Sequence, residues 1–130
     1  MYNSGNTIVS DKTLVMEQEK QYYAFISYKS EDVEWAIWLQ HELEHYHLPA
    51  SFNGRTDIRQ ELRPVFRDID ELSAGNLPKQ IRKELKNSQN LIVVCSPQAA
   101  TSPWVNQEIK TFISLGRTDR IFPFVVEGNS

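Results

Sequence analysis

The sequence predicts a single α/β domain built on a mainly parallel, doubly wound β-sheet. Short apolar segments alternate along the chain with segments of helical periodicity, which is the pattern of strands joined by crossover helices. The length of 130 residues is that of one compact domain, and a composition that is 40% hydrophobic and 11% aromatic is sufficient for a core. The expected order of elements is β-α-β-α-β-α-β.

Four apolar segments are the predicted strands. In chain order they are Tyr22–Ser27, Leu62–Arg67, Asn90–Cys95 and Arg120–Val126. The third contains an apolar run without polar alternation, which is typical of a strand buried on both faces. Pro64 and Pro123 have no N–H to donate to a neighbouring strand. The second and fourth strands are therefore expected near the sheet edges or at strand starts.

Three helices are predicted between the strands from their caps and their apolar periodicity. They run from Ser30 or Asp32 to about Tyr46, from Asn76 and Pro78 to about Asn87, and from Ser102 and Pro103 to just before Gly116. The residues expected to face the sheet are Ala36, Leu39, Leu43 and Tyr46, then Leu77, Ile81 and Leu85, then Val105, Ile109 and Phe112. Ile37 and Trp38 are expected to be exposed, either as ordinary surface residues or as a self-association contact.

Composition and charge indicate how the chain is organised and argue against some classes of partner. We expect residues 1–20 to be a flexible N-terminal tail and residues 21–130 to form the domain. A net charge of −3 argues against nucleic acid as a partner. No apolar run is long enough for a membrane span or an export signal, so we expect no membrane partner. The single cysteine, Cys95, fits a reducing compartment, and we expect a cytoplasmic protein.

A doubly wound sheet places its working surface at the carboxyl ends of the strands, where the strand order reverses. If the order is flavodoxin-like, the first and third strands are neighbours there. Trp104 and Glu108 lie four residues apart on the third helix, so both are expected beside its core face, at the mouth of this crevice. A carboxylate next to an indole can stabilise positive charge developing on a sugar carbon. The alternative for Glu108 is a solvated position on the helix flank.

Four segments together resemble a Toll/interleukin-1 receptor (TIR) domain of the bacterial type. They are Phe25–Asp32, Val65–Ile81, Leu91–Ile109 and Arg120–Gly128. The resemblance implies a flavodoxin-like sheet, homotypic TIR self-association and, as in many members, cleavage of NAD⁺ as a substrate rather than a cofactor. A complete TIR domain usually has a fifth strand and a last helix, so the chain is expected to be short at its C-terminal end, with a possible sensor domain beyond Ser130.

The resemblance also implies roles for individual residues. Glu108 corresponds to the catalytic glutamate of the family, and Trp104 to the aromatic residue one turn before it. Phe25, Ser27 and Lys29 correspond to the first-strand motif that borders the nucleotide, and Leu72, Gly75 and Leu77 correspond to the family's mobile loop. Some NAD-cleaving relatives have an acidic residue where this chain has Ser73 and an arginine where it has Lys29, which leaves affinity and product open.

Two functions fit these observations. In the first, the chain is an NAD⁺ glycohydrolase or cyclase that self-association activates, as the effector part of a bacterial signalling or antiphage defence protein. In the second, it is a non-catalytic TIR–TIR interaction module that relays a signal. A third possibility comes from His41–His45, which matches the H-E-x-x-H zinc-protease signature. These histidines are expected to point to solvent, opposite the apolar stripe, so no metal site is predicted.

Overall fold

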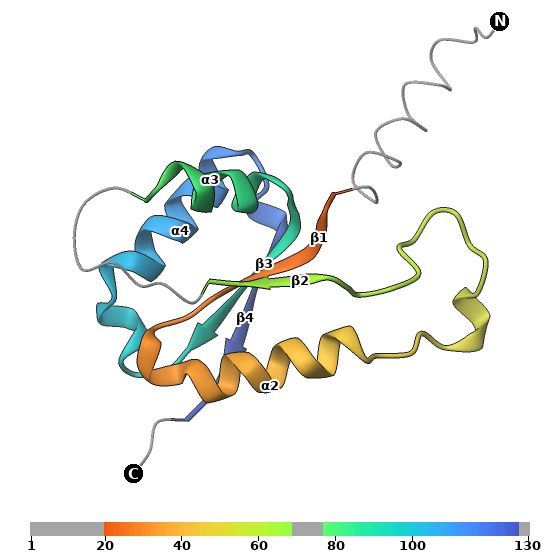
Figure 1. The fold of residues 1–130 in the computed structure, drawn as a ribbon, viewed down its shortest axis with the longest axis horizontal. Coiled ribbons are helices and arrows are strands. Elements are labelled where there is room, and N and C mark those ends of the chain that lie inside the picture. Colours follow the sequence, from red (N-terminus) through yellow and green to blue (C-terminus); the bar gives the residue numbers. More distant parts are fainter. Residues whose placement is uncertain (1–19, 69–76, 128–130) are drawn as a thin grey trace, which may run out of the picture.

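The computed structural model describes residues 20–68 and 77–127, which form a four-stranded, all-parallel sheet with helices on both faces (Figure 1). The strands are β1 (Tyr22–Ser27), β2 (Val65–Arg67), β3 (Ser88–Cys95) and β4 (Ile121–Val125). Their order in the sheet is β2-β1-β3-β4. The predicted fold class is confirmed, and β1 and β3 are the central neighbours at the reversal of strand order.

The two proline-containing strands lie at the edges of this sheet, as predicted. Pro123 is inside β4, and Pro64 comes just before β2. The predicted start of the second strand at Leu62 is wrong, because pairing with β1 begins only at Val65. The Val65 N–H donates to the Glu44 carboxylate at 2.8 Å, so this edge backbone group is paired with a helix side chain.

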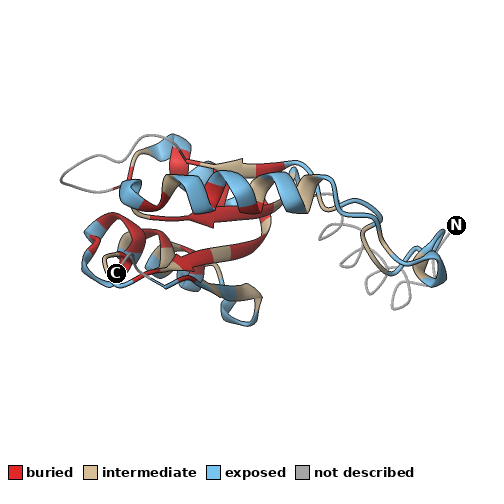
Figure 2. Cartoon of the chain, turned by 90° about the horizontal axis from the view of Figure 1, so that it is seen from below, coloured by how far each residue is buried: buried red, intermediate tan, exposed pale blue. Residues whose placement is uncertain are grey.

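The helices divide the core into two layers. The helix α2 (Val33–Glu44) covers one face of the sheet, while α3 (Lys79–Lys86) and α4 (Pro103–Ser114) cover the other (Figures 1 and 2). The core on the α3/α4 side consists of Phe25, Leu77, Ile81, Leu85, Leu91, Val93, Trp104, Val105 and Phe112. The core on the α2 side consists of Ile26, Tyr28, Ala36, Leu39, Val65, Val94 and Val126.

The start and the end of α4 follow the sequence prediction. The Ser102 hydroxyl accepts a hydrogen bond from the Val105 N–H at 3.1 Å, and Pro103 occupies the first helical position, where no N–H is needed. Gly116 follows the helix with a φ of +79°, a left-handed conformation that glycine adopts without strain. This helix carries Trp104 and Glu108, so its caps set the positions of both.

The first helix differs from the prediction at both ends. Asp32 precedes α2 but does not cap it, because its carboxylate accepts hydrogen bonds from the Ser96 hydroxyl and, at 2.8 Å, from the Gln98 amide. The helix ends at Glu44 rather than Tyr46, since the backbone leaves the helical conformation at His45 (φ −108°, ψ 11°). Tyr46 is consequently exposed and is not part of the core.

Further predictions concern the exposed residues of α2, the start of the second predicted helix and the ends of the chain. Ile37 and Trp38 are exposed, as predicted. The expected helix cap at Asn76 lies outside the described residues, as do the proposed tail at residues 1–19 and Leu72. Among the helices of residues 20–68 and 77–127, none combines the length and the apolar character that crossing a bilayer requires.

Candidate functional site

The centre of the candidate site is the carboxyl group of Glu108. It projects from α4 onto the carboxyl end of β1, where the Ser27 hydroxyl donates a hydrogen bond of 2.6 Å to its Oε1 atom. Both residues are completely buried. Ser27 is the last residue of a central strand, so the sheet and the helix together hold this contact.

A second hydrogen bond lies beside the first. The indole Nε1–H of Trp104 donates to the Asp68 carboxylate at 3.1 Å, and both side chains are buried. Asp68 follows β2 directly, whereas Trp104 is one turn before Glu108 on α4. Ser27, Asp68, Trp104 and Glu108 therefore form one buried polar group, called here the Glu108 cluster, at the carboxyl edge of the sheet.

The surroundings of Glu108 favour its neutral form. Burial raises the pKa of this carboxyl group well above the usual range, because removal from water penalises the charged form. The hydrogen bond from Ser27 lowers the pKa, while the neighbouring Asp68 carboxyl raises it. The Oε2 atom of Glu108 is buried and makes no hydrogen bond to the residues that the structure describes. A buried oxygen without a hydrogen-bond partner is unusual in a folded protein.

The sequence predicted part of this cluster. The structure brings Ser27, Trp104 and Glu108 together. The prediction that Trp104 and Glu108 lie beside the core face of α4 is wrong. They belong to it, since the buried stripe of this helix is Trp104, Val105, Glu108 and Phe112. The spacing of one, four and eight residues is that of a single helical face.

Asp68 is the residue that the sequence analysis missed. It is not among the predicted site residues, yet its side chain is buried and accepts the hydrogen bond of Trp104. Its position in the sequence could have identified it, because a carboxylate directly after a parallel strand lies at the sheet edge where such folds place their functional sites.

Of the remaining predicted nucleotide-binding residues, two are buried in the core and one is at the surface. Phe25 and Leu77 are buried in the core on the α3/α4 side. Lys29 is at the surface after β1, where its ammonium donates to the Thr101 hydroxyl at 3.4 Å and lies 3.8 Å from the Glu31 carboxylate. Leu72 is outside the described residues. Contact of these side chains with a nucleotide stays a prediction.

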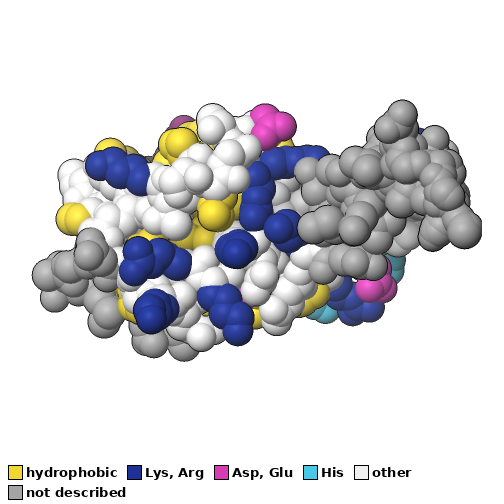
Figure 3. All heavy atoms as spheres, turned by 90° about the horizontal axis from the view of Figure 1, so that it is seen from above, with side chains coloured by type: hydrophobic (Ala, Val, Ile, Leu, Met, Phe, Trp, Pro, Cys, Tyr) yellow, Lys and Arg dark blue, Asp and Glu magenta, His cyan; other side chains and the backbone are white. Residues whose placement is uncertain are grey.

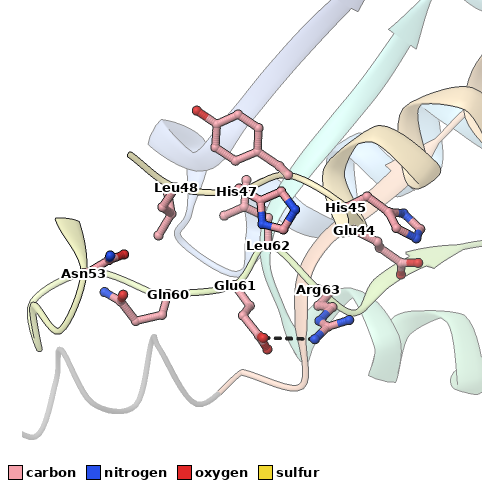
Figure 4. A pocket seen from close by; sticks show the side chains of 10 residues that line it. Glu44, His45, His47, Leu48, Asn53, Gln60, Glu61, Leu62 and Arg63 are labelled. Carbon is pink, nitrogen blue, oxygen red and sulfur yellow. Dashed lines mark hydrogen bonds and ion pairs between the residues drawn. The ribbon is translucent and has the colours of Figure 1, made fainter. Parts of the chain in front are cut away.

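Two surface cavities lie away from the Glu108 cluster. One, of about 430 Å³, is formed by the end of α2 and the segment before β2, with His45, His47 and Glu61 among its lining residues (Figure 4). The other, of about 530 Å³, lies at the start of α2. Glu108 is not among the residues that line these two cavities, and its side chain is completely buried.

The histidines of the H-E-x-x-H signature lie at the C-terminal end of α2, with His41 in its last turn and His45 just after it. His41 and His45 are exposed, as predicted, and their rings stack with centroids 4.2 Å apart. Within residues 20–68 and 77–127, no three His, Cys, Asp or Glu side chains are grouped closely enough to hold a metal ion. The exposed position lacks the walls that a hydrolytic zinc requires.

The raised pKa of Glu108 predicts a pH-dependent stability difference between the wild type and Glu108→Gln. Below the unfolded-state pKa of about 4.3, both states are protonated and the two proteins should be similarly stable. As the pH rises towards the folded-state pKa, the unfolded wild type releases its proton first and the wild type loses stability. At pH 7, urea unfolding should show the variant more stable by about 0.5–2 kcal/mol. A less stable variant at pH 7 would contradict this.

Comparison with known proteins agrees with this arrangement. The family model described as the TIR domain matches residues 24–130. The chain is also 36% identical over 110 residues to the NAD(+) hydrolase ApTIR of Actinoplanes sp., an alignment that covers 83% of this chain but only 14% of that protein. The parallel sheet, the position of Glu108 at its carboxyl edge and the extent of the family match together show that the chain belongs to the TIR domain family.

Proposed function

We propose that this domain cleaves the bond between nicotinamide and ribose in NAD⁺, with Glu108 as its catalytic residue. The observation that carries the proposal is a fully buried glutamate held by Ser27 at the carboxyl edge of the central strands. The relative of 36% identity is named an NAD(+) hydrolase, which supports the substrate. That protein is about seven times longer than the aligned region, so its activity supports the proposal for this chain without establishing it.

The proposed reaction breaks one C–N bond. The electron pair of the bond between ribose C1′ and the pyridinium nitrogen leaves with nicotinamide, which becomes neutral, and positive charge develops on the ribose. An ionised Glu108 would stabilise that charge and hold the ribose hydroxyls. Water then adds to C1′ and loses a proton, which gives ADP-ribose. Attack by a group of the same nucleotide would give a cyclic product instead.

The electrostatics of the cluster suit this role. Burial raises the pKa of this enclosed carboxyl group and so favours its neutral form when no substrate is bound. A bound pyridinium cation favours the ionised form, because an opposite charge nearby offsets the loss of hydration. The carboxylate then acts in a site with little water, where its attraction for the developing ribose charge is strong. Trp104, whose Nε1–H is held by Asp68, would offer its ring to the nicotinamide.

In this conformation Glu108 is not accessible to a substrate. Glu108 has no exposed surface, so the substrate can reach it only after a rearrangement of the elements around it. We propose that self-association provides that rearrangement, and that isolated copies are nearly inactive. We further propose that the domain is the effector part of a cytoplasmic signalling or antiphage defence protein.

A second candidate function is a non-catalytic interaction module. The complete enclosure of Glu108 favours it, because an interaction module requires no access to this carboxyl group. The exposed tryptophans of α2, Trp35 and Trp38, are also typical of a contact surface.

The deciding experiment is direct. Concentrated protein, with and without a crowding agent that promotes association, is incubated with NAD⁺, and nicotinamide release is followed by chromatography. We expect release that rises more steeply than the protein concentration, with ADP-ribose or a cyclic isomer as the second product. No release from protein shown to be associated would favour the interaction module.

A further inference from the structure

The outer surface of α3 and α4 is strongly basic. The charged residues exposed on these two helices are Lys79, Arg82, Lys83, Lys86 and Lys110, called here the basic surface. The acids of the same helices, Glu84 and Glu108, are both buried. Figure 3 shows lysine and arginine side chains gathered over this face, with little acidic surface among them. This concentration of positive charge occurs in a chain whose net charge is −3.

The opposite side of the sheet carries the reverse charge. The exposed charged residues of the short turn Ser30–Asp32 and of α2 include Glu31, Glu34 and Glu42, and these elements contain no lysine or arginine. Trp35 and Trp38 are exposed on the same helix, with Trp38 stacked on Phe124 of β4 at a centroid distance of 6.0 Å. The exposed glutamates and the two tryptophans are called here the acidic surface.

A cavity in the acidic surface has the chemistry to hold a cation. Its volume is about 530 Å³, and its lining includes Glu31, Glu34, Trp35, Trp38 and Glu127. Carboxylates attract an ammonium or guanidinium group, and an indole face adds a cation–π contribution of roughly 0.5–2 kcal/mol. The side chains of Lys and Arg also bury their apolar stems against such rings. An exposed Lys or Arg on a protein surface is therefore a suitable occupant.

We propose that copies of this chain associate back to front, with the basic surface of one copy packed against the acidic surface of the next. The helix α2 and the α3/α4 pair cover opposite faces of one sheet (Figure 1). Their exposed residues carry opposite charge, and this complementarity supports the contact. Each copy uses each surface once, so the contact is heterologous and can repeat. The self-association step of the proposed function would use this contact, but the contact itself needs no NAD⁺.

The expected strength of the contact is modest. Exposed ion pairs contribute at most about 1 kcal/mol each and are screened by salt. Several pairs together with the tryptophan cavity would give a concentration-dependent association that weakens as ionic strength rises. At about 1 M salt the Debye length is roughly 3 Å, and association should be lost or greatly reduced.

Two charge-reversed variants test the arrangement. Variant one is Arg82→Glu with Lys83→Glu, which leaves three lysines against two glutamates on the basic surface and so removes most of its positive charge. Variant two is Glu31→Lys with Glu34→Lys, which makes both surfaces basic. By sedimentation velocity at low salt, without NAD⁺, each variant alone should associate at least about 10-fold more weakly than the wild type, since most of the attraction between the basic and the acidic surface is removed. An equimolar mixture of the two should associate more strongly than either variant alone, because the unchanged acidic surface of variant one can then meet the unchanged basic surface of variant two.

A matched control is Arg55→Glu with Arg63→Glu, which changes the net charge as variant one does but at exposed positions of the segment between α2 and β2. It should associate like the wild type. Circular dichroism and thermal unfolding confirm that each protein is folded.

Other outcomes would overturn the proposal. If variant one associates like the wild type, the basic surface is not part of the contact. If the mixture does not recover, the two surfaces do not meet each other. If variant one alone loses binding to heparin or to anionic vesicles while association is unchanged, the basic surface serves an anionic partner. Because association is measured without NAD⁺, an inactive but normally associating protein would reject the proposed enzyme and leave this contact standing.

Discussion

Glu108→Gln should lower NAD⁺ cleavage by about 10³-fold or more while the fold is retained. The amide has nearly the shape of the carboxyl group and can still accept the hydrogen bond from Ser27. It cannot become an anion, so it cannot balance the positive charge that develops on the ribose. Loss of one such electrostatic group commonly costs about 10²–10³-fold, and the main stabilising charge should cost at least the upper value. Nicotinamide release under associating conditions measures this.

Glu84→Gln is the matched control for that substitution. Glu84 is also a buried glutamate with one oxygen lacking a hydrogen-bond partner among the described residues, but it lies on α3 away from the Glu108 cluster. This variant should keep its activity within about 2-fold, because surface and structural changes outside the site mainly affect stability. Wild-type activity in Glu108→Gln, or equal losses in both variants, would remove Glu108 from the mechanism.

Trp104→Ala should cost about 3–5 kcal/mol of unfolding free energy, the usual range for emptying a buried aromatic position. Trp104 is 5% exposed, packs in the core on the α3/α4 side and donates to Asp68. Trp38→Ala makes the same chemical change at a position that is 49% exposed, and it should cost only about 1 kcal/mol. Denaturant unfolding at high salt compares the two variants without interference from association.

Trp104→Phe separates packing from hydrogen bonding at the same position. The phenyl ring retains most of the apolar volume but removes the Nε1–H donor, so the Asp68 carboxylate loses that partner. The expected cost is about 1–3 kcal/mol. NAD⁺ cleavage should fall as well, because the aromatic ring at position 104 and the Asp68 carboxylate would no longer be held together by a hydrogen bond. A Trp104→Ala variant as stable as Trp38→Ala would contradict the packing described here.

The order and type of the main elements could be predicted because each depends on local signals. The alternation of apolar runs and helical periodicity, the cap at Ser102 and the glycine at position 116 are all visible within a few residues. The prolines at 64 and 123 predicted edge strands for the same local reason. The end of α2 was missed, because Tyr46 continues the helical spacing although the backbone leaves the helix at His45.

The candidate site divides in the same way. Glu108, Trp104 and Ser27 could be named from the sequence, through their spacing and the family resemblance, and the structure places all three in one cluster. Asp68 could not, because a carboxylate among loop charges looks solvated until the end of β2 is seen to lie beside α4. The burial of Glu108 could not be predicted from the sequence either, because helical periodicity shows which face of the helix a residue occupies but not how deeply that face is covered.

The sequence by itself determined the parallel α/β architecture, the edge positions of the proline strands and the candidate acid, because these follow from local backbone chemistry and residue pattern. Only the tertiary structure decided that Glu108 is enclosed, that Asp68 is its neighbour and that opposite charges cover opposite faces of the sheet. Those properties arise from strands and helices distant in sequence being packed together. Packing determines which groups lose their water and which meet, and a one-dimensional pattern does not contain that information.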